Sequence, residues 1–551
     1  MTEQQPIEEG APVKNDKDWW RGAVIYQVYP RSFQDSNGDG IGDLLGIAQR
    51  LPHIASLGVD AVWISPFFRS PMKDFGYDVS DYCDVDPMFG SLADFDVLIE
   101  TAHMLGLRVL IDLVMSHSSD QHPWFVESRS SRDNPRATWY VWADAKPDGT
   151  PPNNWLSIFG GSSWQWDSTR CQYYLHNFLT SQPDLNFHEP EVQEALLEVA
   201  RFWLDRGVDG FRLDTVNFYV HDAQLRDNPP LPPEERNPIT APAVNPYTWQ
   251  NHLYDKTQPE NLEFLARLRT LMDDYNAAAV GEVGEDQRGL EVLGDYTRGD
   301  EHLHMSYAFE LLSDHAPTAP YIKQVMDDME EKAPGGWACW AFSNHDVMRH
   351  VTRWHIPEAA ARMYTTLMMC LRGSACIYQG EELALPEAEL RYEDLQDPYG
   401  KLFWPAFKGR DGARTPMVWT REEHNGGFSS GLPWLPVSQD HLHRTVAEQE
   451  ADPAAILHHY RRAIGFRHAH SALMQGSIED VETHGTVLSF RRRNGNEELF
   501  CAFNVSADPA AIEGPAGQWR QVGVELGSTG KAPDGKLHFG PWQPALALRY
   551  K

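Results

Sequence analysis

The feature that most constrains the fold of this chain is a repeated alternation of short apolar runs and amphipathic helical stretches. Seven runs are short and rich in Val, Ile, Leu and Ala, which is typical of buried parallel strands. They cover residues 23–29, 59–65, 107–113, 208–214, 278–283, 337–343 and 375–379, and a weaker eighth run is expected near residues 302–311. Eight strand–helix units predict an α/β protein with a closed (β/α)8 TIM barrel.

The helices between the strands carry their own sequence signals. Residues 91–105 and 191–206 read as amphipathic helices. Gly58, Gly106 and Gly207 stand just before the next strand, where a helix that leads into a strand commonly ends. We therefore expect the barrel to occupy residues 19–116 and 188–470.

Several segments do not fit the barrel pattern. Residues 117–187, rich in Trp, Pro, Gly and Asn, predict an inserted loop-rich domain after strand 3 that roofs one side of the site. Two long loops are expected at residues 217–258 and, after strand 8, at about 381–437. Short alternating runs from residue 471 to residue 551 predict a C-terminal all-β sandwich domain. Residues 1–18 are polar and acidic, and we expect a disordered N-terminal tail.

Composition narrows the class of partner. The chain has 551 residues, 42% of them hydrophobic, and a formal net charge of −32, which disfavours binding to nucleic acid or to an anionic membrane. No apolar stretch approaches the ~20 residues that span a bilayer, and the polar start of the chain leads us to expect no signal peptide. The six cysteines form no CxxC pair and are expected to be reduced thiols. We expect a cytoplasmic monomer or homodimer that binds a small molecule.

Polar residues gather where the predicted strands end. Five segments share this pattern: Asp112-Leu-Val-Met-Ser-His117, Gly210-Phe-Arg-Leu-Asp214, Gly281-Glu282-Val283, Phe342-Ser-Asn-His-Asp346 and Tyr378-Gln-Gly-Glu381. The carboxyl ends of barrel strands open onto one face, so these side chains are expected to converge. Two carboxyl groups close together, with one protonated, suffice to cleave a glycosidic bond.

The individual residues suggest different roles. Arg212 and Asp214 lie on one side of their strand by period-two alternation, and a guanidinium there should lower the pKa of the carboxyl and orient it as a nucleophile. A structural ion pair is the alternative. Glu282 would serve as a general acid if apolar surroundings and Asp214 raised its pKa, although a helix cap is the more ordinary role for such a residue. Asp346 adds a third carboxylate beside His345.

Together these segments resemble the α-amylase superfamily, glycoside hydrolase family 13. Residues 20–33 (WRGAVIYQVYPRSF) resemble the family's opening segment. Gln182-Pro-Asp-Leu-Asn186 and Arg410-Asp-Gly-Ala-Arg-Thr-Pro-Met417 are similar to signatures of its α-glucosidase and oligo-1,6-glucosidase branch. The resemblance extends from about Trp19 to the C-terminus.

The resemblance implies a role for each matching residue. Asp214 would be the nucleophile, Glu282 the acid/base and Asp346 the stabiliser of the transition state. The substrate-binding set that it implies is Asp74, Tyr77, His117, Phe159, Phe178, Gln182, Arg212, Thr215, His345 and Arg414. Asp74 and Arg414 would clamp the terminal hydroxyls and close the pocket, which implies an exo-acting enzyme.

The implied activity is that of a retaining α-glucosidase, with transglucosylation as a side reaction. Thr215 follows the nucleophile, and in this branch threonine there accompanies α-1,4 preference and valine α-1,6 preference. An oligo-1,6-glucosidase, a sucrose-hydrolysing α-glucosidase, a glucosyl-transferring isomerase and, more remotely, an inactive sugar-binding relative remain as alternatives. The family usually has Asn where this chain has Ser116, so we expect a neighbouring side chain to be oriented differently.

An acidic loop near the N-terminus is a candidate metal site. Asp35, Asn37, Asp39 and Asp43 offer side-chain oxygens, and Ile41 offers a backbone carbonyl, at alternate positions. Hard cations such as Ca²⁺ or Mg²⁺ bind such oxygen sets. The family carries a divalent ion in this loop, away from the chemistry, so the expected role is structural. An acidic turn without a metal is the alternative.

Overall fold

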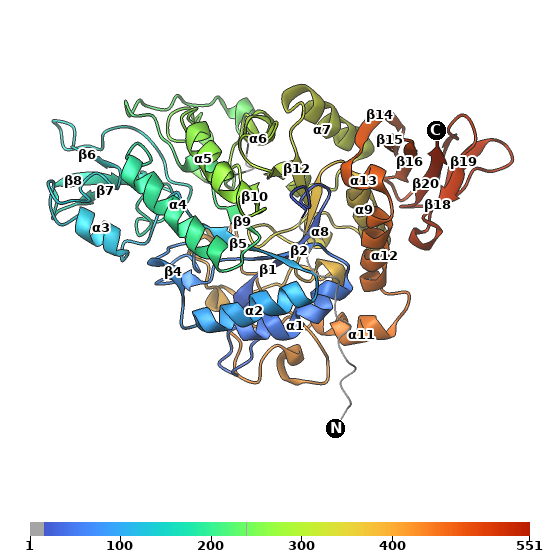
Figure 1. Ribbon diagram of the computed structural model, residues 1–551, viewed down its shortest axis with the longest axis horizontal. Coiled ribbons are helices and arrows are strands. Elements are labelled where there is room, and N and C mark those ends of the chain that lie inside the picture. The colour runs from blue at the N-terminus through green and yellow to red at the C-terminus, as the bar shows by residue number, and fades with distance from the viewer. Residues whose placement is uncertain (1–15, 238–239) are drawn as a thin grey trace.

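The computed structural model describes residues 16–237 and 240–551, and a closed parallel barrel forms its centre (Figure 1). The strands follow the order β1-β13-β12-β11-β10-β9-β5-β2 around the barrel. Their bounds are β1 (Val24–Val28), β2 (Ala61–Ile64), β5 (Arg108–Leu113), β9 (Gly210–Leu213), β10 (Ala278–Gly281), β11 (Met305–Ala308), β12 (Ala338–Ala341) and β13 (Ser374–Tyr378). The predicted TIM barrel is confirmed, and its weak eighth run is β11.

The barrel interior is filled with side chains. Ile25, Trp63, Leu110, Val280 and Met305 belong to one buried cluster contributed by successive strands. Such filling makes the barrel a packed core rather than a pore, so a ligand must bind at its mouth.

Helices surround the barrel and bury their apolar faces against it (Figure 1). They are α1 (Leu44–Ser56), α2 (Leu92–Met104), α4 (Pro190–Asp205), α5 (Asn261–Asp273), α6 (Gly289–Thr297), α7 (Ala319–Lys332), α8 (His350–Arg353), α9 (Glu358–Cys370), α11 (Val446–Ala451) and α12 (Ile456–His468). The start of α2 shows how local sequence fixes a helix end, because Ser91 and Asp94 form a reciprocal capping box.

The segment predicted as an insertion holds a small antiparallel sheet. It contains α3 (Pro123–Ser128), β6 (Trp142–Ala143), β7 (Trp164–Asp167) and β8 (Gln172–Leu175), with the strand order β6-β8-β7. A bridge between His117 and Asp184 joins the two ends of the segment beside the barrel. A hairpin of β3 (Phe68–Arg69) and β4 (Asp81–Val85) lies after β2.

The C-terminal part is an antiparallel sheet domain at the opposite end of the molecule from the insertion (Figure 1). Its elements are α13 (Ser471–Gln475), β14 (Ser477–His484), β15 (Val487–Asn494), β16 (Glu497–Asn504), β17 (Ala510–Glu513), β18 (Arg520–Val522), β19 (Lys536–Phe539) and β20 (Pro544–Tyr550). A five-stranded sheet, β14-β15-β16-β20-β18, packs on the β17–β19 pair across a cluster that includes Val487, Phe500 and Phe539.

The two long loops carry short helices. The segment 217–258 contains η3 (Pro233–Glu235) and η4 (Pro246–Trp249), and residues 238–239 of it lie outside the described part. The segment 381–437 contains η6 (Glu381–Leu383), η7 (Tyr392–Asp394), α10 (Pro398–Phe403) and η8 (His424–Gly427). This segment returns to the barrel mouth: the Met417 backbone N–H donates to the Ser32 carbonyl oxygen, close to the end of β1.

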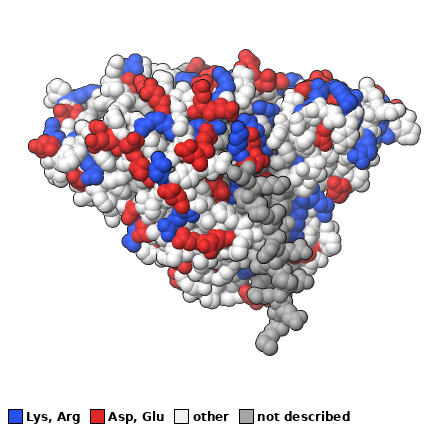
Figure 2. Space-filling model, in the orientation of Figure 1, with Lys and Arg blue, Asp and Glu red and all other residues white. Residues whose placement is uncertain are grey.

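The predicted disordered tail falls mostly on residues 1–15, which lie outside the described residues. Its last positions differ from the expectation, since Asp16 and Asp18 take part in a turn and Asp18 pairs with Arg21 at 3.3 Å. Acidic and basic side chains are interspersed over the described part of the face shown in Figure 2. None of the described helices is both long enough and apolar enough to span a bilayer.

Candidate active site

A single buried guanidinium organises the mouth of the barrel. Arg212, on β9, lies opposite Asp112 on β5 in the strand register. Its Nη1 donates to Asp112 Oδ1 at 2.7 Å and to Asp214 Oδ1 at 2.6 Å, and its Nη2 pairs with Glu282 Oε2 at 2.7 Å. Asp214 and Glu282 each follow the last residue of a strand, β9 and β10. Both predicted catalytic carboxyl groups therefore lie on the same mouth of the barrel and flank one planar cation.

The charge balance at Arg212 differs from our expectation. Burial raises the pKa of Asp214 to about 7 and that of Asp112 to about 6, although Arg212 acts to lower both. Arg212 lowers the pKa of Asp214, as the sequence argument expected, but burial outweighs this effect. The sequence argument counted neither burial nor the sharing of the guanidinium among three carboxyl groups. One positive charge cannot stabilise three buried negative charges fully.

Glu282 behaves as a general acid requires. Burial is the main cause that raises its pKa to about 7, and the charges of Asp214 and Asp346 act in the same direction. Because burial raises the pKa of Glu282 to about 7, this carboxyl group can hold a proton near neutral pH. The two catalytic carboxyl groups can then supply an acid and a nucleophile at the same time.

Asp346 lies in a strongly cationic part of the site. Its Oδ1 accepts from Arg414 Nη2 at 2.8 Å and from Arg410 Nη1 at 3.3 Å, and His345 Nε2 lies 3.2 Å from Oδ2. The adjacent His345 ring and the guanidinium groups of Arg410 and Arg414 hold the pKa of Asp346 well below its usual range despite burial. Asp346 is therefore ionised and offers free acceptor capacity to a ligand.

His345 and Tyr77 form one wall of the site. Their rings stack with centroids 5.6 Å apart and planes 6° from parallel, and the Tyr77 hydroxyl hydrogen-bonds His345 Nε2. Gln27 contacts the other ring nitrogen at 2.7 Å. Burial lowers the pKa of His345 to about 3, so the ring is neutral and fixed in orientation.

Asp74 is clamped by a residue that we did not predict. Its Oδ1 accepts from Arg410 Nη2 at 3.0 Å, and its Oδ2 accepts from Gln182 at 3.1 Å. Arg414 donates from Nε to the backbone carbonyl of His345 at 2.7 Å and so orients the His345–Asp346 segment. That Asp74 and Arg414 grip the terminal hydroxyls of a sugar stays a prediction.

Arg410 also binds Asp397, which sequence reasoning missed. Arg410 Nη2 lies 2.8 Å from Asp397 Oδ1, and both residues come from the long loop after β13. Arg410 opens the segment that resembles the branch signature, so a signal for it existed. No pattern in the sequence singled out Asp397.

An aromatic pair closes the side of the site that the insertion provides. The Phe178 ring centroid lies 5.0 Å from that of His117 and 5.9 Å from that of Phe159. The Arg410 guanidinium lies 5.5 Å from the Phe159 centroid. His117 Nε2 lies 3.0 Å from the Tyr77 carbonyl oxygen and 3.2 Å from Gln182. The structure thus brings every predicted catalytic and substrate-binding residue to this mouth, while their roles stay predictions.

Thr215 contacts both catalytic carboxyl groups. Its backbone N–H donates to Glu282 Oε2 at 3.0 Å, and its hydroxyl donates to Asp214 Oδ2 at 3.2 Å. Its φ is +39°, a left-handed conformation that is rare for a β-branched residue. This turn places the Thr215 side chain next to Asp214 and its backbone N–H next to Glu282.

Glu381 does not join the site, although it ends one of the five segments. Its side chain is fully buried and accepts from the Tyr460 hydroxyl of α12 at 3.1 Å. Burial raises its pKa to about 8. The expectation that the carboxylates of all five segments converge was therefore wrong for Glu381, because the left-handed turn at Gly380 redirects the chain.

The acidic loop near the N-terminus curls through successive side-chain turns. The side chains of Asp35, Asn37 and Asp39 each accept the backbone N–H two residues later, at 2.9 Å. Such turns direct side-chain oxygens toward the inside of a loop. The described residues contain no group of three or more His, Cys, Asp and Glu that could hold a metal, so a cation here would need Asn37 and backbone carbonyl oxygens as well. The oxygen-only donor set fits Ca²⁺ or Mg²⁺.

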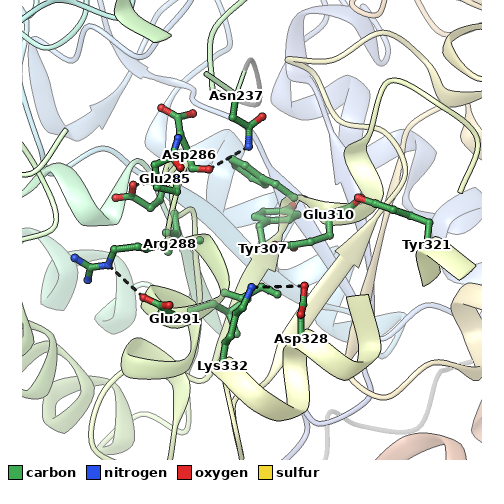
Figure 3. Close-up of a pocket in the computed structure, with 16 residues that line it drawn as sticks. Asn237, Glu285, Asp286, Arg288, Glu291, Tyr307, Glu310, Tyr321, Asp328 and Lys332 are labelled. Carbon is green, nitrogen blue, oxygen red and sulfur yellow. Dashed lines mark hydrogen bonds and ion pairs between the residues drawn. The ribbon is translucent and has the colours of Figure 1, made fainter. Parts of the chain in front are cut away.

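A second cavity lies beside the loop that follows Glu282 (Figure 3). It measures about 220 Å³, and its lining includes Asn237, Glu285, Asp286 and Glu310. Its charged groups are partly paired, as in Arg288–Glu291 at 3.3 Å. None of the predicted site residues lines it, so it is distinct from the group of residues around Arg212.

Comparison with known proteins agrees with this geometry. Residues 27–476 match the model of the α-amylase catalytic domain. The chain belongs to this family. A probable alpha-glucosidase of Rhizobium meliloti (strain 1021) is 68% identical over 507 residues, which cover 91% of this chain and 92% of the relative. The predicted superfamily is confirmed.

Further relatives place the chain within the family. An oligo-1,6-glucosidase of Heyndrickxia coagulans is 36% identical and covers 96% of this chain and 99% of its own. The crystal structure of the α-glucosyl transfer enzyme XgtA superposes with a TM-score of 0.93 at 55% identity, over 96% of this chain and 99% of that one. The predicted α-glucosidase and oligo-1,6-glucosidase branch is confirmed as well.

The Arg410 contacts generate a prediction. Replacing Arg410 by Gln removes the charged hydrogen bond to Asp74, which is worth about 1.5–3 kcal/mol, so kcat/KM for an α-glucoside should fall roughly 10- to 150-fold. Steady-state kinetics measure this, with Arg391→Gln as the matched control. Arg391 lies in the same loop, but its side chain is 76% exposed. Equal kinetics for the Arg410 variant and the control would refute the clamp.

Proposed function

We propose that the protein is a retaining, exo-acting α-glucosidase that releases terminal α-1,4-linked glucose from maltose and short glucosides. The observation that carries this proposal is the Arg212 guanidinium, which pairs with both Asp214 and Glu282, while burial raises the pKa of Glu282 to about 7. Retaining enzymes need carboxyl groups about 5–5.5 Å apart, and two groups on one guanidinium suit that spacing. The names of the relatives support the same activity.

The chemistry follows from the positions of the carboxyl groups. Asp214, held by Arg212 and Thr215, attacks the anomeric carbon while Glu282 protonates the leaving oxygen. A covalent β-glucosyl enzyme forms. Glu282 then takes a proton from water, which displaces Asp214 and leaves glucose with its α configuration. Asp346, ionised by its neighbours, accepts hydrogen bonds from ring hydroxyls and favours a flattened ring.

The end of the pocket determines where the substrate is cut. Asp74, Arg410 and Gln182 form a buried polar wall, which suits the hydroxyls of a terminal sugar. A pocket closed on that side accepts one residue and excludes the middle of a chain. If an acceptor hydroxyl replaces water in the second step, the product is a glucoside. Transglucosylation is therefore part of the proposed function, and XgtA, named as an α-glucosyl transfer enzyme, supports it.

Replacing Asp214 by Asn should abolish turnover. Asparagine keeps the shape but cannot act as the nucleophile, so we expect kcat to fall at least about 10⁴-fold, as for removal of other catalytic nucleophiles. Release of glucose from maltose measures the activity, and circular dichroism checks that the fold is kept. Substantial residual activity in a folded variant would exclude Asp214 as the nucleophile.

Linkage preference is the finer part of the proposal. Thr215 lies between the two catalytic carboxyl groups, so its side chain borders the position of the scissile bond. Maltose, isomaltose, sucrose and maltotriose, with products resolved over time, separate the α-1,4 enzyme from an oligo-1,6-glucosidase and from a sucrose-hydrolysing α-glucosidase. An inactive sugar-binding relative would bind these sugars without turnover.

Replacing Thr215 by Val should raise the cleavage of isomaltose relative to maltose. Valine has the same shape, but it removes the hydroxyl and makes this position apolar. The ratio of kcat/KM for the two disaccharides is the measurement, and we expect it to rise several-fold. An unchanged ratio would show that linkage is determined elsewhere.

We propose further that the loop of Asp35, Asn37, Asp39, Ile41 and Asp43 holds a structural Ca²⁺ or Mg²⁺. Its side chains and the Ile41 carbonyl would supply oxygen ligands, away from the catalytic carboxyl groups. Asp43 also caps α1 by accepting from Gly46 at 2.6 Å, so order in the loop bears on the first barrel helix.

Chelation tests the metal proposal. EDTA should lower the Tm, because a bound ion stabilises the folded state by mass action. Asp39→Asn should lower the Tm and make it insensitive to EDTA, whereas exposed Asp534→Asn, far along the chain, should keep the response. A Tm of the unaltered protein that EDTA leaves unchanged, with no metal found by elemental analysis, would contradict the proposal.

The remaining proposals concern location and assembly. We propose a cytoplasmic location, supported by the six cysteines, which are all free thiols. The alternatives of monomer and homodimer are separated by light scattering.

A further inference from the structure

A short chain of hydrogen bonds leads from His117 to the nucleophile. His117 Nδ1 lies 2.8 Å from Ser116 Oγ, which lies 3.0 Å from Thr215 Oγ1. The Thr215 hydroxyl in turn lies 3.2 Å from Asp214 Oδ2. All four residues are buried, and the first two come from the end of β5 while the last two follow β9. Ser116 therefore bridges the ends of the two strands, because its hydroxyl contacts one residue from each.

We propose that Ser116 is a positioning residue that joins His117 to the nucleophile through Thr215, in a relay whose hydrogen bonds all run toward Asp214. This inference rests on the proposed function, because it takes Asp214 to be the nucleophile. It adds a role for Ser116, which replaces the family's usual asparagine.

Counting protons fixes the direction of the relay. A hydroxyl has one proton, so when Thr215 donates to ionised Asp214, its oxygen must accept from Ser116. Ser116 then has no proton left for His117 and must accept from Nδ1–H. Burial lowers the pKa of His117 to about 4, so the ring is neutral and carries a single proton. His117 Nε2 then accepts from Gln182, which lies 3.2 Å away, and faces the Tyr77 carbonyl oxygen at 3.0 Å without a proton to donate.

The hydrogen bonds could also run in the opposite direction, from Asp214 toward His117, but a different hydrogen bond would then be lost. In that case His117 Nε2–H would donate to the Tyr77 carbonyl at 3.0 Å. The Ser116 hydroxyl would donate to His117 Nδ1, and the Thr215 hydroxyl would donate to Ser116. Asp214 Oδ2 would then lose the Thr215 donor. The direction toward Asp214 gives up the bond from Nε2–H to the Tyr77 carbonyl. A hydrogen bond to a carboxylate is about twice as strong as one between neutral groups, so we infer that this direction prevails while Asp214 is ionised. When Asp214 becomes an ester, that advantage is lost and the reverse direction is favoured.

The relay also bears on the strained turn at Thr215. A left-handed conformation costs a β-branched residue free energy and persists only where surrounding contacts determine it. Ser116 is one of those contacts. Ser116 is itself held in place, because its backbone carbonyl accepts from the Leu185 backbone N–H at 3.0 Å. The orientation of the nucleophile is therefore linked to the inserted segment.

The pH dependence of kcat/KM tests the relay. Removing a donor from a carboxylate raises its pKa, so the acid limb should move to higher pH. We expect a shift of about one pH unit for Thr215→Val and a smaller shift in the same direction for Ser116→Ala. The charged groups that face Asp214 stay in place in both variants: Asp112 on β5, Arg212 on β9, Glu282 after β10 and Asp346 after β12.

The double variant separates a relay from two independent effects. Since Ser116 acts through the Thr215 hydroxyl, Ser116→Ala should add no shift in a Thr215→Val background. Ser118→Ala is the matched control, because this buried serine bonds Tyr140 instead of the site, and its acid limb should not move. Additive shifts, or no shift for Ser116→Ala, would overturn the proposal.

Neutron diffraction of the unaltered protein gives an answer that does not depend on turnover. In crystals kept above pH 8, deuterium is expected on His117 Nδ1, on Ser116 toward Thr215 and on Thr215 toward Asp214. Deuterium on Nε2, with the Ser116 hydroxyl pointing at Nδ1, would overturn the proposal. A protein without activity on any α-glucoside would refute the proposed function, while the neutron maps would still decide the direction of the relay.

Discussion

The sharing of one buried guanidinium among three carboxyl groups is the interaction on which the site depends. A buried charge is costly unless it is paired and hydrogen-bonded. Arg212 meets that condition with Asp112, Asp214 and Glu282, all within 2.7 Å. Because the group then carries more potential negative than positive charge, a proton remains in the site at neutral pH. General acid catalysis needs such a proton, and here it follows from the stoichiometry of the ion pairs.

The barrel makes this arrangement possible. Asp112 on β5 and Val280 on β10 both lie opposite Arg212 of β9 in the strand register, and Glu282 comes two residues after Val280. The packed interior below them gives the carboxyl groups a rigid floor of low polarity. The loops above contribute different side chains, since the inserted segment supplies Phe159, Phe178 and Gln182, whereas the loop after β13 supplies Arg410 and Arg414.

The sequence predicts the fold and the catalytic carboxyl groups because both depend on local patterns. Strand runs and their polar ends are visible in the sequence, even for the weak run that becomes β11. Contacts from long loops are not. Arg410 reaches Asp74 over 336 positions, so no spacing rule could reveal this contact. The raised pKa of Asp214 and the departure of Glu381 likewise depend on which groups share a partner in three dimensions.

Thr215 shows how strain and function meet in this turn. With φ at +39°, glycine would adopt the backbone conformation more easily than threonine. Glycine, however, would remove the hydroxyl that meets Asp214 and Ser116, while the backbone N–H to Glu282 would remain. The side chain therefore compensates for the conformational cost through contacts with the nucleophile. The strain persists because the site, rather than local propensity, determines the conformation of this residue.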